Sequence, residues 1–489
     1  MAFLHGSEVI EIDDGARAIS TVKMGVIGLV FESEQCAPAI AARLSVGSVA
    51  LDDAMTFTAV TAGNASNALN ISLMAEGASA DIAVTVTEKH IAIMAATDAE
   101  GAMTSTAAEI VDAINNAPEA AQLITASLPA GTDGGAVPMM FGAKYLTGGA
   151  DEPFPYHVPV AIAGSVKAAE GMGIRTDAYK SVKNMLKQTG ALIVAVRAKP
   201  LKAPQTNAAN ITEAISYFAD AKGETGYKPR ILVAPGFSHV DGVAKELEVM
   251  AKRLRAFAYI DCELSASYTD AMKRARSFGD RVEVQWPHVK VQDDTGEYVP
   301  RPLSEFAAGL RARIDNEKGV HWSKSNQEIY GIVGTWQRVS WELSDKSSIA
   351  NQLNENKVST VIREGGFRFW GNRSCAIDPK WTFECVRRVA DMINDSIELN
   401  HLWAVDRPGT TQYLQDVLGG IQAYMRDLTN QGIIPGGSAW LDPELNSPSQ
   451  MQQGIYYFDF DFGVYYPAEH LIFRSHLNNG YLEEVIANV

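Results

Sequence analysis

Residues 231–261 read ILVAPGFSHVDGVAKELEVMAKRLRAFAYID. In this stretch an apolar run, Ile231 to Ala234, precedes a helical pattern from about Val240 to Leu254, and a second apolar run follows from Phe257 to Asp261. Two apolar strands joined by one amphipathic helix are typical of a βαβ unit, whose strands lie parallel in one sheet. The stretch therefore predicts a parallel sheet that is covered by helices.

The same alternation extends to both sides of this unit. Strand-like runs again alternate with helical patterns, at Val158 to Ala163, Asp177 to Lys187, Leu192 to Val196, Ile211 to Ala221, Thr269 to Phe278 and Val282 to Trp286. Such a series favours an α/β core, with a mixed, mostly parallel sheet and flanking helices on both faces.

The last third of the chain mixes long helices with strands. Thr382 to Trp403 and Thr411 to Leu428 each carry an apolar stripe at helical spacing. Residues Ile455 to Tyr466 alternate between aromatic and polar side chains, which predicts a half-buried strand. Two further strand-like runs follow, His470 to Phe473 and Tyr481 to Ile486.

One segment near the N-terminus has a different composition. Residues 35–152 are rich in Ala, Thr, Gly, Ser and Asn, and they contain short β-prone runs and one helical stretch, Thr104 to Asn116. We expect a small β-rich domain that is inserted into the chain. The predicted division is an N-terminal arm with the first core strand at 1–34, the insert at 35–152, the α/β core at 153–345, and a C-terminal domain ending in a β arm at 346–489.

The composition excludes several classes of protein. Lys and Arg total 42 against 58 Asp and Glu, and the resulting net charge of −16 disfavours direct binding to nucleic acid without a local basic patch. The basic clusters around Lys252 and Lys273 lie in helical patterns and are typical of solvated helix faces. No apolar run approaches the roughly 18 residues of a membrane span. The N-terminus lacks the basic and apolar regions of a signal peptide, so we expect a protein that folds in a cytoplasm.

Motifs that carry chemistry are incomplete. The four cysteines show neither CxxC spacing nor a histidine at zinc-ligand spacing, so buried thiols are expected and no metal site is predicted. Gly171-Met172-Gly173 lacks the third glycine of a dinucleotide motif, and Gly223 to Lys228 lacks the ending of a P-loop.

Two polar groupings resemble parts of hydrolase sites. Ser238 and His239 follow a strand, but a nucleophile elbow requires glycine where Val240 stands, so Ser238 is predicted to cap the next helix. Asp459 and Asp461 share one strand face, as a glycosidase pair would, yet alternating Phe and Asp describes any half-buried strand. No catalytic, cofactor-binding or metal-binding residue is predicted, and no cofactor.

One segment carries a resemblance to a known family. Residues Gly366-Phe367-Arg368-Phe369-Trp370-Gly371-Asn372-Arg373-Ser374-Cys375, then Trp381, then Val386-Arg387-Arg388-Val389-Ala390-Asp391-Met392-Ile393, closely resemble the signature of contractile tail sheath proteins of phages and R-type bacteriocins. His5-Gly6 through Gly15-Ala16-Arg17 is similar to the N-terminal arm of the P2-like branch. Tyr156 to Val160 and Pro467 to Phe473 look like its first α/β strand and its C-terminal approach strand. The resemblance leaves out residues 35–152, which are similar to the surface insertions that differ between sheath proteins.

The resemblance implies a structural subunit. Such subunits polymerise as stacked hexameric rings around a tail tube and contract to drive the tube through the host envelope. The implied partners are further copies of the chain, the tail tube protein, and the baseplate and tail terminator proteins, with no direct nucleic acid and no membrane insertion. The implied location is the virion tail, assembled in the host bacterial cytoplasm.

Alternatives remain open at this point. The chain could form the sheath of a phage-derived bacteriocin or another contractile injection particle. Type VI secretion sheaths fit less well, since they are built from two different chains. The alternative from another class is an α/β enzyme that processes nucleotides or sugars, which should show one deep polar pocket.

The resemblance also implies which residues join subunits. Each terminal arm would add a strand to a sheet of a neighbouring subunit. The candidate donor residues are Phe3, Val9 and Ile10 in the N-terminal arm and Leu482, Val485 and Ile486 in the C-terminal arm; the alternative is that these strands pair within their own subunit. By its position, the helix from about Thr411 to Leu428 resembles the part that touches the tube, with Asp416 and Arg426 as candidate contacts, although a core helix would look the same.

Overall fold

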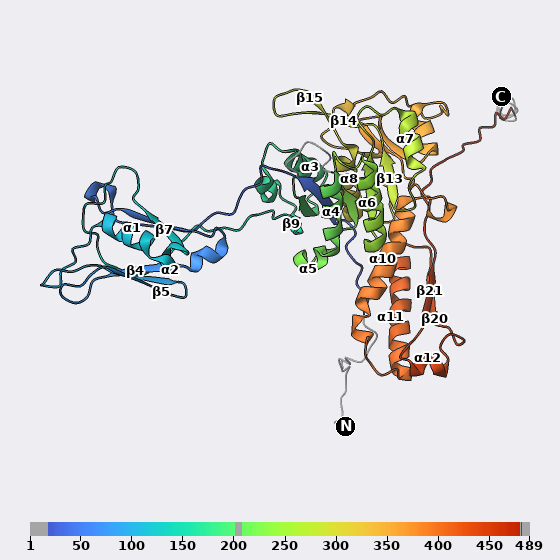
Figure 1. The fold of residues 1–489 in the computed structure, drawn as a ribbon. Coiled ribbons are helices and arrows are strands. Elements are labelled where there is room, and N and C mark those ends of the chain that lie inside the picture. Colours follow the sequence, from blue (N-terminus) through green and yellow to red (C-terminus); the bar gives the residue numbers. More distant parts are fainter. Residues whose placement is uncertain (1–17, 201–207, 480, 482–489) are drawn as a thin grey trace, which may run out of the picture. The chain divides into compact units, whose positions relative to one another are not determined.

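The computed structural model describes residues 18–200, 208–479 and 481 (Figure 1). These residues form two compact units. The insert unit comprises residues 32–160 and 167–180, and the core unit comprises the described parts of residues 1–31, 161–166 and 181–489.

A nine-stranded sheet forms the centre of the core unit. Its strand order is β16-β19-β18-β13-β12-β11-β1-β10-β9. The strands are β1 Ile27–Glu32, β9 Val160–Ala163, β10 Leu192–Ala198, β11 Ile231–Val233, β12 Phe257–Asp261, β13 Val282–Gln285, β16 Gln327–Glu328, β18 Val358–Arg363 and β19 Phe367–Trp370. β1, β11, β12, β13 and β18 pair in parallel, whereas β19 runs antiparallel to both β18 and β16. The sheet is therefore mixed.

Helices cover both faces of this sheet (Figure 1). On β12, Ala258 and Ile260 are buried in one cluster with α4 Ala208–Ser216, α6 Asp241–Leu254 and α7 Tyr268–Ala275. Because strand side chains alternate, Phe257 and Tyr259 face the other side, where α8 Leu303–Glu317 packs on β11 and β12. The core unit also contains α5 Ala221–Thr225 and α9 Ile349–Glu355, and β14 Val289–Gln292, β15 Tyr298–Arg301 and β17 Gly334–Thr335 form a small sheet.

The C-terminal part of the core unit is a helical layer with a hairpin. It consists of α10 Glu384–Asn400, α11 Thr411–Asn430, β20 Gly437–Leu441, α12 Pro448–Gln452 and β21 Phe458–Phe462. Ile393 of α10, Ile421 and Met425 of α11 and Ala439 of β20 are buried in one apolar cluster, against which the aromatic side of β21 packs. The predicted apolar stripes therefore pack the two helices and the hairpin together.

The insert unit contains two sheets and its own apolar core. β2 Arg43–Val46, β3 Met55–Ala59 and β7 Ile124–Ser127 form one sheet; β4 Asn70–Met74, β5 Ala83–Thr87, β6 His90–Met94 and β8 Phe141–Tyr145 form the other. α1 Ala107–Asn116 begins at a capping box formed by Thr106 and Glu109, and α2 spans Pro118–Ala121. α3 Asp177–Leu186 follows the insert in the chain.

Two local predictions differ from the structure. The run His470 to Phe473 was expected to form a strand, but these residues are exposed and pair with no strand among the described residues. Ser238 does not cap α6, whose N-cap is Val240; Ser238 is fully buried, and its hydroxyl donates to Asp261 Oδ2 (3.1 Å). The fold places Asp261 at the beginning of α8, where it accepts hydrogen bonds from Ser304 and from Ser238. The hydroxyl of Ser238 therefore binds Asp261 and does not cap α6.

Candidate assembly surfaces

The predicted interface residues are divided by the structure. Phe3, Val9, Ile10, Leu482, Val485 and Ile486 lie outside the described residues. Asp416 and Arg426 lie on α11, outside its buried stripe of Val417, Ile421 and Met425. Asp416 is half-buried and accepts a hydrogen bond from Gln412 Nε2 at 2.7 Å, and Arg426 is exposed.

The N-terminal segment reaches the sheet by running along α10. Ser20 exchanges hydrogen bonds with Asn400 at the end of this helix, at 2.8–3.1 Å. Val22 N donates to Ser396 Oγ at 3.0 Å, and the carbonyl of Met24 accepts from Arg388 at 2.9 Å. The N-terminal root, residues 18–26, is therefore held by polar side chains of α10 over three turns of helix.

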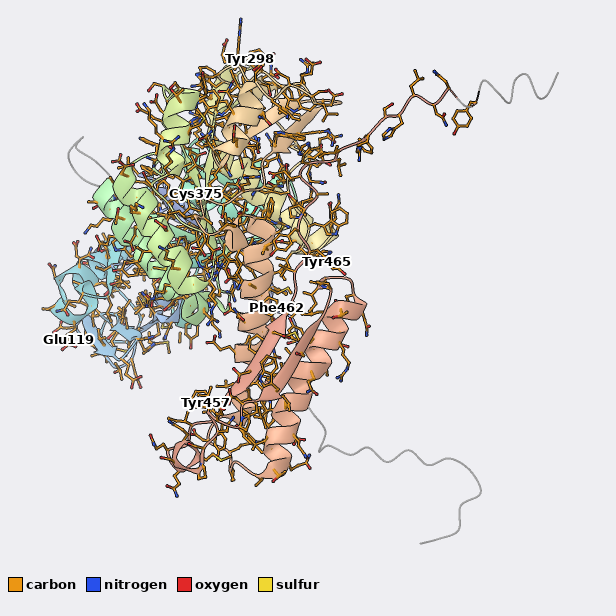
Figure 2. The ribbon with its side chains drawn as sticks, turned by 90° about the vertical axis from the view of Figure 1, so that its right-hand side faces the viewer. Glu119, Tyr298, Cys375, Tyr457, Phe462 and Tyr465 are labelled. Carbon is orange, nitrogen blue, oxygen red and sulfur yellow. The ribbon has the colours of Figure 1, made fainter. Side chains whose placement is uncertain are left out.

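The C-terminal segment leaves the core unit at the opposite end of α10. After β21, Tyr466 packs edge-on against Phe383 (6.2 Å between ring centroids), and Glu469 forms a two-bond ion pair with Arg373, at 2.8 and 2.5 Å. Beyond this pair the side chains project into solvent, and two views show the segment extending away from the core unit (Figures 1 and 2). Exposed fractions are 64% for Leu471, 74% for Ile472, 88% for Phe473 and 95% for Leu477. An exposed apolar segment of this kind marks a surface that another chain covers.

The β20–β21 hairpin has two unpaired sides. The two strands pair only with each other among the described residues, in the register Gly437↔Phe462 to Leu441↔Phe458. One face packs on α11, and Asp461 accepts hydrogen bonds from the backbone and hydroxyl of Ser438. Of the two aspartates noted in the sequence, Asp461 thus bonds within the hairpin, whose outer edges can accept further strands.

The inner face of α10 carries buried charges that sequence reasoning missed. Glu384, Arg388, Asp391 and Asp395 recur at helical spacing and all are buried. Arg388 binds Asp315 of α8 with two bonds, at 2.8 and 2.7 Å. Further pairs link Asp391 to Arg281 and Asp395 to Arg230 and Arg255. The only sequence signal for this buried face was that charged residues recur three or four positions apart on one side of the predicted helix.

A fully buried lysine completes this network. Lys324 Nζ donates to Glu283 at 2.6 Å and also to Glu384, which accepts a further bond from the Tyr259 hydroxyl at 2.5 Å. Burial raises the pKa of Glu283 to about 7 against the attraction of Lys324, and the Glu384 charge adds to the rise. Burial opposes ionisation of Glu384 as well, but Lys324, Arg311 and Arg388 together lower its pKa to about 2. The network therefore keeps Glu384 ionised at neutral pH, whereas Glu283 gains or loses its proton near pH 7.

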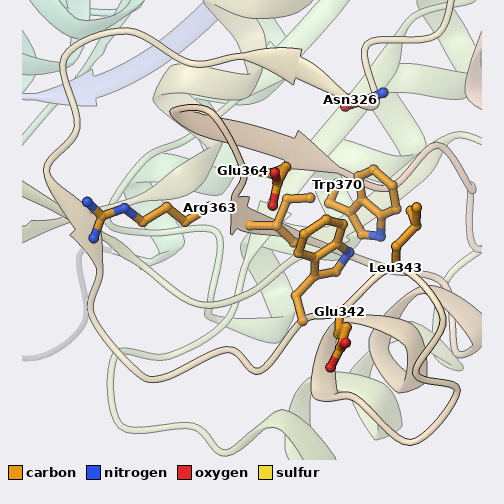
Figure 3. Close-up of a pocket in the computed structure, with 8 residues that line it drawn as sticks. Asn326, Glu342, Leu343, Arg363, Glu364 and Trp370 are labelled. Carbon is orange, nitrogen blue, oxygen red and sulfur yellow. The ribbon is translucent and has the colours of Figure 1, made fainter.

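A pocket of about 530 Å³ lies at the β16 side of the sheet (Figure 3). It is lined by Trp341 and Trp370, which pack edge to face at 5.7 Å, with Glu342 and Glu364 at its border. Within residues 18–200 and 208–479, no group of three or more His, Cys, Asp or Glu side chains is arranged to hold a metal ion. The same residues include no helix that is long and apolar enough to cross a bilayer.

Comparisons with known proteins agree on one family. The phage tail sheath protein central domain matches residues 205–375, and the phage tail sheath C-terminal domain matches residues 377–478. A prophage major tail sheath protein of Pseudomonas aeruginosa is 36% identical over 70% of this chain and 91% of its own length. The tail sheath protein of Escherichia phage P2 is 32% identical over 69% of this chain and 89% of its own. That of Burkholderia phage BcepMu is 29% identical over 98% of both chains.

Solved structures show the same fold. The sheath of an extracellular contractile injection system, PVC, in the contracted state matches with a TM-score of 0.54 and 16% identity, over 68% of this chain and 89% of that one. The contracted helical sheath of the anti-feeding prophage matches with a TM-score of 0.54 and 18% identity, over 66% and 89%.

Proposed function

Since the chain belongs to the contractile phage tail sheath family, we propose that it polymerises as stacked hexameric rings around a tail tube and contracts to drive the tube through an envelope. It is a structural tail sheath protein and not an enzyme. The work of contraction would come from a free-energy difference between two packings of the same subunits.

The observation that carries this proposal is the presence of donor and acceptor surfaces on one chain. The C-terminal segment beyond Glu469 is exposed and apolar, and the β20–β21 hairpin has unpaired edges. When one copy donates to a different surface of the next copy, the contact is heterologous, and heterologous contacts that do not close generate helical polymers.

Strand addition supplies enough free energy to join subunits. A strand of about five residues adds roughly five main-chain hydrogen bonds of about 0.5–1.5 kcal/mol each, or several kcal/mol in total. Burial of exposed side chains such as Ile472 and Phe473 would add to this. Phe3, Val9 and Ile10, and Leu482, Val485 and Ile486, remain the proposed donor residues. Residues 464–479 pair with no strand within the described part of the chain, which favours donation to a neighbour.

We assign the tube contact to α11. Its buried stripe faces α10 and the hairpin, so Asp416 and Arg426 lie on the remaining surface. Charge reversal at either residue should weaken binding to the tube and leave sheath polymerisation unchanged. Loss of both properties together, or of neither, would contradict the assignment.

The insert would lie on the outside of the sheath as a surface domain. Residues 35–152 contain 3 Lys and Arg and 13 Asp and Glu, which gives −10 of the chain's net charge of −16. The P2 and Pseudomonas relatives match about 70% of this chain over nearly all of their own length, whereas the BcepMu protein matches 98%. A separately folded and strongly acidic domain fits a position in solvent better than one between packed subunits.

The proposed partners are the tail tube, baseplate and tail terminator proteins, in a virion tail assembled in the host cytoplasm. The alternative is the sheath of a phage-derived bacteriocin or another contractile injection particle; the PVC and anti-feeding prophage sheaths share the fold of this chain. The subunit would perform the same mechanical task in either particle.

Electron microscopy of the purified chain tests the polymer. The concentrated full-length protein should form hollow, helically striated tubes. A variant that lacks residues 1–15 should stay folded, as judged by thermal unfolding, and should form no tubes. Small uniform particles from the full-length chain, in the presence of a cognate tube as template, would refute polymerisation; tubes from the truncated variant would refute the role of the N-terminal arm.

A further inference from the structure

Both chain ends of the core unit are attached to one helix. The N-terminal root contacts α10 at Arg388, Ser396 and Asn400. The C-terminal segment contacts Phe383, the residue before α10, and Arg373, whose backbone forms a bridge with Phe383. The two segments leave the core unit from opposite ends of this helix (Figures 1 and 2).

The helix between the two attachments is stiff and short. α10 has 17 residues, so at 1.5 Å per residue it is about 25 Å long. It is joined to the rest of the core unit at four successive levels by Glu384–Lys324, Arg388–Asp315, Asp391–Arg281 and Asp395–Arg230. Ion pairs have defined partners and geometry, so they oppose sliding of the helix along its own axis more than apolar contacts do.

We propose that α10 transmits tension from one arm to the other, and that the Arg373–Glu469 pair is the latch that aligns the C-terminal arm with it. This inference rests on the proposed polymer, because tension exists only where both arms are held by neighbouring subunits. Load that enters at Asn400 then passes along the hydrogen-bonded helix and leaves at Phe383. The N-terminal root also continues directly into β1, so part of the load reaches the nine-stranded sheet. The ion pairs of Arg230 and Arg281 hold this sheet to α10, and the core unit can therefore move as a rigid body.

At the latch, the Arg373–Glu469 pair, the C-terminal segment passes from residues that contact the core unit to residues that are exposed. Tyr466 and Glu469 contact the core unit, whereas the apolar side chains from Leu471 to Leu477 are mostly exposed. Both partners of the ion pair are one-third exposed, and the two bonds fix the orientation of the carboxylate relative to the guanidinium. Without them, the contact between Tyr466 and Phe383 would still attach the segment, but the carboxylate of Glu469 would no longer fix its direction.

The test compares Glu469→Gln with a matched control. Asp241→Asn breaks a more exposed ion pair of the same length, Arg274–Asp241 at 2.5 Å, at the beginning of α6. Glu469→Gln should leave thermal unfolding of the free subunit unchanged and should raise the protein concentration needed for tube formation about fivefold, the scale expected from one well-ordered surface pair. The double reversal Arg373→Glu with Glu469→Arg should restore the wild-type concentration, and Asp241→Asn should not change it.

A second measurement detects the latch without polymerisation. In a Cys36→Ser background, which removes the most accessible native thiol, spin labels at cysteines introduced in place of Leu402 and Leu471, both exposed, report the direction of the C-terminal segment relative to α10. The distance distribution should be narrow in the parent protein and broad with Glu469→Gln.

Unchanged tube formation and an unchanged distance distribution in Glu469→Gln would overturn the latch, as would equal impairment by Asp241→Asn. In that case the full-length chain still forms tubes, so the proposed function stands. If the full-length chain forms no tubes around a cognate tube, the proposed function fails, and the inference about tension fails with it.

Discussion

Replacement of Lys324 by methionine should strongly destabilise the core unit. Lys324 and Glu283 have no exposed side-chain surface, and Glu384 is 2% exposed. The substitution removes the ammonium group, which bonds to both carboxylates and lies 4.5 Å from the centroid of the Tyr259 ring and 5.0 Å from that of Phe369. Loss of one partner from a buried ion pair costs about 3–5 kcal/mol, since the remaining charge is left without compensation.

The loss should depend on pH in a defined direction. Because the pKa of Glu283 is raised to about 7 in the folded state, the favourable contribution of its protonated form is complete below the ordinary value of 4.5 and is lost as the pH rises through 7. Removal of Lys324 raises this pKa further. The destabilisation by Lys324→Met should therefore be larger at pH 8 than at pH 5. At pH 8 the folded variant must either bury an unpaired Glu283 carboxylate or take up a proton from a solution that contains few, whereas at pH 5 Glu283 is already protonated.

Urea unfolding followed by tryptophan fluorescence measures the effect in the relevant part of the chain. All eight tryptophans lie between Trp286 and Trp440, so the signal follows the core unit and not the insert. With an m-value of about 3 kcal/mol/M, the expected loss lowers the midpoint at pH 8 by about 1–1.7 M. The control Lys245→Met breaks a half-exposed pair with Glu248 and should cost less than about 1 kcal/mol. Equal midpoints for Lys324→Met and Lys245→Met, or the same loss at pH 5 and pH 8, would refute the assignment of the buried charges.

Two further predictions concern the insert and the thiols. Replacement of residues 35–152 by a short glycine-serine linker should leave the urea midpoint detected by tryptophan fluorescence unchanged, and the variant should still form tubes. The reason is that the insert has its own apolar core, and an insoluble product would contradict the predicted boundaries. Burial raises the pKa of the Cys262 and Cys375 thiols to about 12 and that of Cys385 to about 11, so near pH 8 a thiol reagent should modify the half-buried Cys36 first and the others only on unfolding; rapid reaction of all four would exclude this packing.

Local patterns predicted the strands that are continuous apolar runs and the helices that carry an apolar stripe. The strand expected at Phe257 to Asp261 is β12 with the same bounds, and the helix expected from about Val240 is α6, which begins at Asp241. α8 was not predicted, because it is buried on all sides and includes Glu305, Arg311 and Arg313, whose partners come from other parts of the chain. A helix of this kind has no apolar stripe for a sequence to show.

The inner face of α10 illustrates the same limit at the candidate site. Val389 and Ile393 belong to the apolar stripe that the sequence predicts for this helix, and in the structure both are buried in one cluster with side chains of α11. The burial of the charged side could not be predicted, because Lys324, Asp315 and Arg281 are distant in sequence and meet it only in the folded chain. At His470 to Phe473 the local pattern predicted a strand that the structure does not contain. A strand needs a neighbouring strand to pair with, and the described residues of the same subunit provide none.

The buried charges on α10 fix the position of the helix to which both terminal segments are attached. Well-packed apolar side chains at the same positions would be about as stabilising or more so, because desolvation offsets most of the attraction in a buried ion pair. Charged partners provide instead a single permitted register, since a shift of one helical turn would leave Glu384 and Arg388 facing groups of the wrong sign. A subunit that must keep its two attachment points at a fixed separation while its neighbours rearrange requires such a register. We therefore interpret the signature around Arg387-Arg388 and Asp391, which carried the resemblance to sheath proteins, as the part of the chain that keeps α10 in place under load.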